Sequence, residues 1–288
     1  MSRSSFPALL ASLALLLAPS LNAQDLKELE QNMKQKYEGK VLVLRGFYTG
    51  RHLRYDPNGK PLKRAQEGAW SVDGGVQIER VKLAEKTLEI LGKRVYARYL
   101  DELKDFEYVS SEREVKIEAE LSTTFPEVAA TELVQRIFLT GDEKLSDHVP
   151  PYWQNFLRSW EGRGSKSQTP NGPAPAKTDP QSSATGASTQ TKIHSIGGEV
   201  SPPRCISCPN PRYTEAARQY RHEGKTVLWA VLSESGRVES ITIAKPLGMG
   251  LDEEAVEAVQ KWRFEPARRN GEPIATRFTL EVNFHFTR

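Results

Sequence analysis

The sequence predicts an α+β protein in which two domains are joined by a disordered linker. Ten of the 18 prolines lie within Pro150–Pro211, and no aromatic residue occurs between Trp160 and Tyr213. Before this region, turn signals follow one another closely, as is typical of antiparallel β structure. After it come two helical patterns and one long alternating strand, as is typical of a small α+β domain.

The linker is expected over residues 164–192, where most side chains are those of Ser, Thr, Gln, Pro, Ala and Gly. Such a segment has too few apolar side chains to offset the conformational entropy that is lost on folding. It separates a mainly antiparallel β domain, residues 24–163, from an α+β domain, residues 193–288. Each domain is long enough to build its own core.

The composition excludes several classes of protein. The 288 residues carry 40 Lys and Arg against 37 Asp and Glu, so a net charge of +3 provides no strong field for nucleic acid or anionic lipid. Two cysteines cannot form a disulfide framework. No apolar run approaches the roughly 18 residues that a membrane-spanning helix needs. We therefore expect neither a polytopic membrane protein nor a nucleic-acid-binding protein.

The first 23 residues have the pattern of an export signal. Arg3 precedes the apolar run Leu9–Ala18, Pro19 breaks that run, and a small residue stands just before Gln24. This order is typical of a secretory signal that is cleaved before Gln24. The alternative is an uncleaved inner-membrane anchor, although the apolar run is short for that role.

Turn chemistry predicts hairpins in the N-terminal domain. Asp56–Gly59 and Asp73–Gly75 contain Pro, Asn and Gly, residues that preset or tolerate the backbone angles of tight turns. Apolar residues alternate with charged ones over Val115–Leu121, as in a strand with one face in water. We expect an antiparallel barrel or a strongly curved sheet, with strands at Trp70–Val72 and Val76–Ile78.

Helices are expected in this domain around Leu26–Met33, Pro126–Phe138 and Trp153–Trp160. We interpret the aromatic stripe of the last helix as core rather than as a docking surface. His52 and His148 each stand alone in polar sequence, and no metalloprotease, nucleophile-elbow or nucleotide-binding motif occurs. We therefore predict no catalytic residue, no cofactor and no metal site, and a protein that is not an enzyme.

The C-terminal domain has clearer signals. A helix is expected after Pro211, followed by a hairpin whose first strand, Val227–Leu232, is apolar on both faces and therefore central. A second helix runs from Leu251 to Trp262, with acidic residues at its start and basic ones at its end, as the helix dipole favours. Over Thr276–Phe286 apolar residues alternate with polar ones, as in a strand with one wet face.

Together these residues resemble the C-terminal domain of the TonB family. The resemblance covers roughly a third of the chain, about Gly198–Phe286, and its most specific part is a Trp-Arg-Phe-x-Pro block with the helix before it. The matching positions, interpreted as mostly structural, are Tyr213, Ala217, Gly224, Gly236, Leu251, Ala255, Trp262, Arg263, Phe264 and Pro266.

The resemblance implies a fold of two helices packed on a three-stranded antiparallel sheet. It also implies a function, namely strand addition to the TonB box, a short peptide at the periplasmic face of outer-membrane receptors. Such a receptor uses energy from the inner membrane to import iron chelates, cobalamin or other substrates. The implied location is the periplasm, and the implied partner is an outer-membrane TonB-dependent receptor.

The expected docking edge is the final strand, because a strand that ends the chain and has a hydrophilic face suits a sheet edge. Arg277 and His285 are candidates for side-chain contacts, with the alternative that they only keep the edge soluble. The edge consists of the backbone groups of Arg277, Phe278, Thr279, Leu280, Glu281, Val282, Asn283, Phe284, His285 and Phe286.

Two features depart from TonB itself. TonB has an uncleaved membrane helix with a polar residue that engages the ExbB–ExbD motor, whereas residues 1–23 contain no His. TonB also has a long, stiff spacer that is rich in proline and charged residues, whereas the segment 164–192 is short and nearly uncharged. Contact with ExbB–ExbD is thus an open question. The alternative function is a non-energised periplasmic adaptor that uses the TonB-like domain as an interaction module.

Cys205 and Cys208 form a CxxC pair in a proline-rich segment. A zinc site would need a second ligand pair, which the sequence does not offer at the usual spacing. In an oxidising periplasm we expect a local disulfide between the two cysteines. Closing so small a loop contributes about 2 kcal/mol at most.

Overall fold

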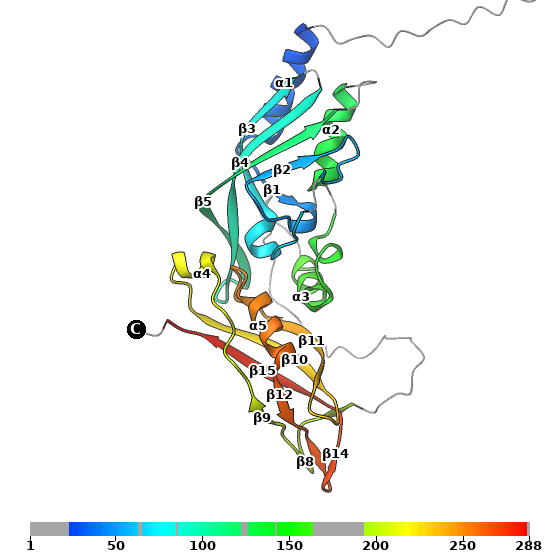
Figure 1. Cartoon of the computed structure of the whole chain (residues 1–288), viewed down its shortest axis with the longest axis vertical. Helices are drawn as coiled ribbons and strands as arrows, with labels where there is room; N and C mark the ends of the chain where they lie inside the picture. Colours follow the sequence, from blue (N-terminus) through cyan, green and yellow to red (C-terminus); the bar gives the residue numbers. More distant parts are fainter. Residues whose placement is uncertain are drawn as a thin grey trace, which may run out of the picture.

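The computed structural model describes residues 23–62, 65–84, 86–121, 126–141, 143–163 and 193–286. The predicted signal lies outside the described residues except for Ala23, and the predicted linker lies entirely outside them. Helices and strands of the N-terminal half, residues 23–163, stack above those of the C-terminal half, residues 193–286 (Figure 1). None of the described helices is long and apolar enough to cross a membrane.

The N-terminal half is built on a six-stranded sheet of order β2-β5-β4-β3-β1-β6. Neighbouring strands are antiparallel except β2 and β5, which run parallel. The order ends at β2 and β6, so the described strands make an open sheet rather than the barrel that was one expectation. The strands are β1 (Val41–Leu44), β2 (His52–Tyr55), β3 (Gly75–Ala84), β4 (Thr87–Leu100), β5 (Asp105–Glu120) and β6 (Phe138–Leu139).

Three helices accompany this sheet: α1 (Ala23–Tyr37), α2 (Pro126–Ile137) and α3 (Pro151–Glu161). Leu29 and Met33 of α1 are buried in a cluster with the sheet, as their helical spacing predicts. The expected strand at Trp70–Val72 is wrong, because Trp70–Gly74 form a π-helical turn and the strand β3 begins at Gly75. Such turns are rare and often lie at functional contacts.

The C-terminal half contains a four-stranded sheet of order β11-β10-β15-β7. Its strands are β7 (His194–Ser195), β10 (Gly224–Leu232), β11 (Val238–Lys245) and β15 (Thr276–Phe284). β10 is antiparallel to both neighbours, while the short β7 lies parallel to β15 and adds a strand to the three that were expected. Trp229 is 41% exposed, so the outer face of the central strand β10 is open to solvent at this position, although Val231 on the same face is buried. The expectation of burial on both faces is therefore wrong at Trp229.

The helices α4 (Glu215–Gln219) and α5 (Leu251–Lys261) belong to this half. Leu251, Ala255 and Val259 recur at helical spacing and are fully buried, so α5 turns its apolar face to the core. Short strand pairs complete the far end of the half, and these strands are β8 (Val200–Ser201), β9 (Arg204–Ser207), β12 (Arg263–Glu265), β13 (Arg268–Arg269) and β14 (Glu272–Pro273).

The two halves share one apolar core. A single cluster of buried residues joins Trp70, Phe106 and Trp153 of the N-terminal half to Leu251 and Phe278 of the C-terminal half. The rings of Trp70 and Trp153 pack edge to face, with centroids 5.3 Å apart. Sequence patterns did not indicate this continuity, because each half has enough apolar residues to be read as a domain of its own.

Backbone hydrogen bonds also cross between the halves. Met249 N–H donates to the Ala97 carbonyl over 2.8 Å, and Tyr99 N–H donates to the Leu247 carbonyl over 3.1 Å. The strand β4 therefore pairs locally with the loop that precedes α5. We define the interdomain interface as the contact between two sets of residues. Leu247–Glu253 contribute from the C-terminal half, and the N-terminal half contributes Ser71, Ala97–Tyr99 and Tyr152–Trp153.

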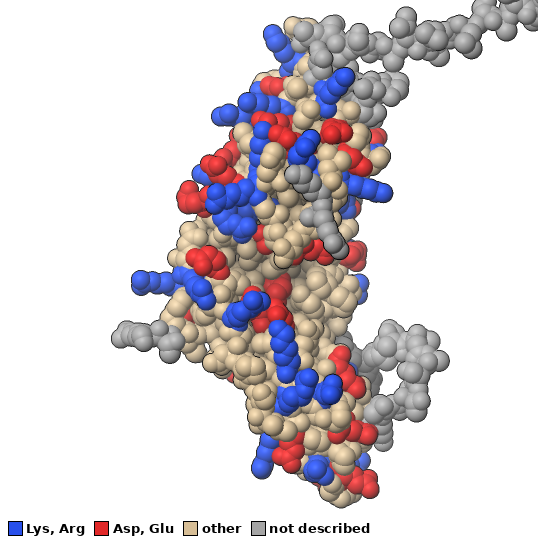
Figure 2. Space-filling model, viewed as in Figure 1, with Lys and Arg blue, Asp and Glu red and all other residues tan. Residues whose placement is uncertain are grey.

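The charged surface agrees with the nearly balanced composition. Figure 2 shows Lys and Arg side chains interspersed with Asp and Glu over both halves, without a large area of one sign on the visible face. Many of these charges form ion pairs, such as Arg98 with Glu107 and Lys245 with Asp101. Such a surface favours solubility and gives no general attraction to polyanions.

Candidate functional site

The candidate site is the edge of the C-terminal sheet formed by β15. On its inner side β15 pairs with β10 along its whole length, from Thr276 opposite Leu232 to Phe284 opposite Gly224. On its outer side only the short β7 pairs with it, at Thr276 and Arg277. Beyond those two positions, the rest of β15 has no neighbouring strand among the described residues.

The hydrogen bonds to β7 show which backbone groups face the open edge. His194 N–H donates to the Ala275 carbonyl over 3.0 Å, so residue 275 points its carbonyl toward that edge. Successive residues of a strand direct their backbone groups to opposite edges. The amides and carbonyls of Thr279, Glu281 and Asn283 therefore face the open edge. The backbone groups of the residues between them form the hydrogen bonds with β10.

Side chains of β15 alternate as its sequence predicts. Phe278, Val282 and Phe284 are buried, and Phe278 packs against Phe264 with ring centroids 5.4 Å apart. The residues whose backbone faces the edge are exposed, namely Arg277, Thr279, Glu281, Asn283 and His285. Phe284 is the last residue of the strand.

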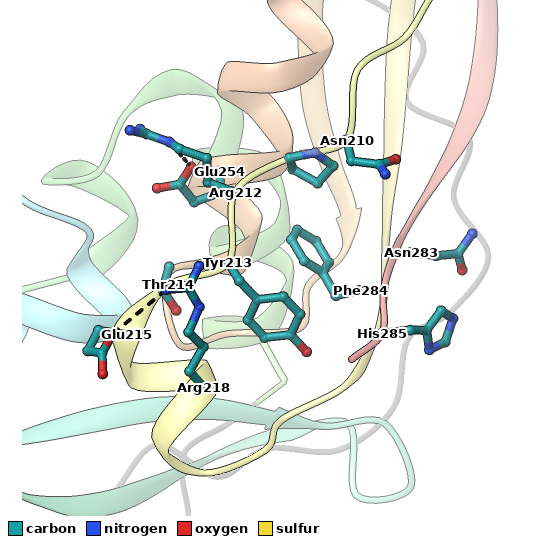
Figure 3. A pocket seen from close by; sticks show the side chains of 11 residues that line it. Asn210, Arg212, Tyr213, Thr214, Glu215, Arg218, Glu254, Asn283, Phe284 and His285 are labelled. Atoms are coloured by element: carbon teal, nitrogen blue, oxygen red, sulfur yellow. Dashed lines mark hydrogen bonds and ion pairs between the residues drawn. The ribbon is translucent and has the colours of Figure 1, made fainter. Parts of the chain in front are cut away.

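A groove of about 970 Å³ lies at the C-terminal end of this edge. Figure 3 shows the side chains of Phe284 and Tyr213 together on one side of the strand, with Arg218 of α4 near Tyr213, whereas His285 projects to the other side. The groove continues past Arg212 to Glu254. Its lining mixes aromatic and charged side chains, which suits a peptide segment better than a small apolar ligand.

Aromatic stacking holds the floor of the groove. The Tyr213 ring lies 5.6 Å from that of Phe284 and 4.6 Å from that of Phe286, measured between centroids. The Tyr213 hydroxyl donates to the His222 carbonyl over 2.7 Å, and burial raises the pKa of that hydroxyl. The Phe286 N–H donates to the Glu223 carboxylate, so Phe286 is tied back toward β10 and is not part of the open edge.

The wall of the groove carries a network of charges. Arg212 donates to Glu254 and to Glu257, each over 3.1 Å, and these pairs raise the pKa of the Arg212 guanidinium. Hydrogen bonds from Lys261 lower the pKa of the Glu257 carboxyl. Among the described residues, Arg218 has only Glu215 within ion-pair distance, at 4.0 Å. Its guanidinium is thus the most weakly paired cation of the groove.

The motif residues of the C-terminal half lie in its core and turns rather than at the edge. Trp262 is buried, and its indole N–H donates to the Pro209 carbonyl over 2.9 Å. Arg263 donates to the Trp262 carbonyl over 2.8 Å instead of pairing with a helix carboxylate. Gly236 has φ +76°, and a Cβ there would lie 1.9 Å from the Phe264 carbonyl oxygen, so only glycine fits.

The remaining motif positions also lie in the core or at the ends of strands. Ala217 and Ala255 are fully buried, where a larger side chain would displace the core. Gly224 opens β10 with φ +151°, and Pro266 follows directly after β12. These residues set the fold that presents β15, and none of them lies on its open edge.

Cys205 and Cys208 form a disulfide in the structure, with Cα atoms 6.1 Å apart. Both sit on or beside β9, which pairs antiparallel with β12 directly after α5. The bridge therefore braces the segment that leads into the groove. No cluster of three or more potential metal ligands occurs in the parts of the chain that the structure describes.

Two parts of the site were missed by sequence reasoning. Arg218 lies in the groove, and Tyr213, which was interpreted as structural, lines it as well. Their closeness to β15 depends on contacts between residues some seventy positions apart, which spacing patterns do not encode. The only signal in the sequence was the Tyr213 position of the family motif.

Comparisons with known proteins agree on the nature of this half. Residues 209–286 match the family model described as Gram-negative bacterial TonB protein C-terminal. The chain is 31% identical over 86 residues to Protein TonB of Escherichia coli strain K12, covering 29% of this chain and 35% of that protein. It is 31% identical over 75 residues to Protein TonB of Xanthomonas campestris pv. campestris strain B100, covering 26% of this chain and 34% of that protein.

A solution NMR structure of the Pseudomonas aeruginosa TonB CTD also aligns, at 22% identity and a TM-score of 0.24, covering 33% of this chain and 98% of that one. The chain spans about a third of the length of the TonB proteins it matches.

Proposed function

We propose that this protein binds the TonB box of an outer-membrane receptor by strand addition to β15. The premise is that residues 209–286 form a C-terminal domain of the TonB family. The observation that carries the proposal is the open edge of β15, whose amides and carbonyls from Thr279 to Asn283 meet no strand among the described residues. An extended peptide satisfies such groups by completing the ladder.

The short strand β7 supports a definite register for the peptide. It occupies the edge at Thr276 and Arg277, so the peptide must pair from Thr279 onward. A strand laid there reaches the groove at its far end, beside Asn283 and His285. Backbone pairing then supplies affinity, and the groove supplies contacts to one or two side chains of the peptide.

Proline substitution tests the proposal because proline has no N–H to donate. Thr279→Pro and Glu281→Pro remove donors that face the open edge and leave the ladder with β10 intact. We expect each to weaken binding of a synthetic TonB-box peptide at least tenfold in isothermal titration. Thr279→Ala and Glu281→Ala are the matched controls, because they remove the same side chains and keep the amide.

Two results would contradict the proposal. One is unchanged peptide affinity in both proline variants, provided that their amide exchange shows an intact β10–β15 ladder. The other is an equal loss of affinity in the alanine controls, which would place recognition in the side chains rather than in the backbone.

We further propose that receptor binding supports energy-dependent import across the outer membrane, by way of an exported protein located in the periplasm. The second candidate function is that of a periplasmic adaptor without an energised step. The apolar core that the two halves share favours this alternative, because a TonB-like domain that is fixed to another folded unit can serve as an interaction module. The mass of the protein from its native envelope, with membrane fractionation, separates the two. Retention of residues 1–23 in the inner membrane supports transduction through ExbB–ExbD, and a soluble chain that starts at Gln24 supports the adaptor.

A further inference from the structure

A sheet in the order β11-β10-β15-β7 has two sides at which a strand can be added. The side at β15 is the proposed docking edge. The other side is β11, whose stretch from Ser240 to Ala244 contains no charged residue. An uncharged edge strand with β-branched residues is a general template for pairing with other chains, and proteins usually cover such an edge.

The N-terminal half covers β11. Its last helix α3 packs along β11, and the two elements lie next to each other in Figure 1. Tyr152 and Phe156 of α3 pack against the same apolar cluster as Val238 and Ile241 of β11. The helix thus occupies the space beside β11 that an added strand would need.

Polar contacts fix the helix in that place. Trp153 of α3 donates its indole N–H to a Glu253 carboxylate oxygen of α5 over 2.9 Å. Gly250 N–H donates to the hydroxyl of Ser71, in the π-helical turn, over 2.9 Å. Both bonds lie in the interdomain interface, and neither involves a backbone group of β15.

We infer that the N-terminal half is an edge guard, by which we mean that α3 (Pro151–Glu161) blocks strand addition at β11 and confines it to β15. The inference rests on the proposed function for the identity of the peptide, but it predicts self-association whether or not that peptide binds. It assigns a role to residues 23–163, for which sequence motifs indicate none.

The test opens the interface in the full chain. Glu253→Arg introduces a positive charge into the interface from α5, and Tyr152→Arg introduces one from α3. In the double variant, the two introduced guanidinium groups also repel each other. Glu272→Arg is the matched control, because it makes the same change at an exposed residue of β14 that belongs neither to the interdomain interface nor to the lining of the groove. Loss of exchange protection at Met249 and Gly250 reports that the interface has opened.

We expect the wild type and Glu272→Arg to be monomeric and to bind one TonB-box peptide per chain. The opened variants should self-associate at least tenfold more tightly in sedimentation equilibrium, or bind a second peptide, and their β11 amides should become protected in that state. Glu253→Arg should keep its affinity for the first peptide within about twofold.

An opened variant that stays monomeric and binds one peptide would overturn the edge guard and leave the β15 proposal standing. If no variant or wild type binds any peptide while the opened variants self-associate through β11, the proposed function fails and the edge guard holds. A variant that loses β10–β15 amide protection has unfolded, and the other single variant then decides the question.

Discussion

We predict that the carboxyl group of Glu253 makes the interdomain interface sensitive to pH. Its Oε2 atom is buried and has no hydrogen-bond partner within the part of the chain that the structure describes, while Oε1 accepts from Trp153. Burial, with the nearby Asp252 carboxylate as a second cause, raises the pKa of Glu253 to about 8. Burial also raises the pKa of Asp252 to about 6. Both acids therefore bind protons more tightly in the folded state than in the unfolded state.

The sign of the effect follows from this difference. A group whose folded pKa is raised contributes stability that is present at low pH and is lost as the pH rises through the folded pKa. At pH 6 the Asp252 carboxyl is already about half ionised in the folded state, so most of the slope between pH 6 and pH 8 comes from Glu253. The slope is about 1.4 kcal/mol per pH unit near pH 6 and falls to half of that near pH 8, where the Glu253 carboxyl is half ionised in the folded state. The loss over that range is therefore roughly 2 kcal/mol.

Glu253→Gln removes the titration and keeps an acceptor for Trp153. We expect the free energy of unfolding of the wild type to fall between pH 6 and pH 8 and that of the variant to stay level, so the variant gains roughly 2 kcal/mol over the wild type. Urea unfolding at half-unit pH steps measures this. Glu257→Gln is the control, because the low pKa of Glu257 keeps it ionised throughout this range. Parallel pH profiles for wild type and Glu253→Gln would refute the reasoning.

Two further predictions concern the backbone and the disulfide. Gly248→Ala places a Cβ 2.4 Å from the Ala97 carbonyl oxygen across the interface, so we expect a loss of about 3 kcal/mol in urea unfolding, against about 1 kcal/mol for Gly271→Ala, which has a similar φ and open space. Equal losses would place the strain within the loop alone. Replacing Cys205 and Cys208 by serine should cost at most about 2 kcal/mol and leave peptide affinity unchanged. Two free thiols per chain in denatured, unreduced protein would show that the disulfide does not form.

Local patterns predicted the elements of the C-terminal half well. The alternation over Thr276–Phe286 identified β15 and the face it buries, and the spacing of Leu251, Ala255 and Val259 identified α5 and its buried face. These features depend on the strand period of two and the helix period of 3.6, which neighbouring residues carry in the sequence itself. The Trp-Arg-Phe-x-Pro block indicated the family that this half resembles.

Prediction was weaker wherever distant segments meet. Trp70–Val72 was expected to be a strand that leads into a turn at Asp73–Gly75, because apolar residues there suit either structure. Instead, Trp70–Gly74 are π-helical, and this form accompanies the contact between Ser71 and Gly250. The exposure of Trp229 was also missed, since a strand that is apolar on both faces does not reveal which of its positions stay uncovered.

The sequence by itself determined which residues form β15, which face of it is buried, and the family to which the C-terminal half is related. Only the tertiary structure decided that β11 is covered and β15 is open, and that both halves share one core. The physical reason is that side-chain periodicity is local, whereas the occupation of a sheet edge depends on which distant segment packs beside it. Here that segment is α3, which the chain places against β11 across the interdomain interface.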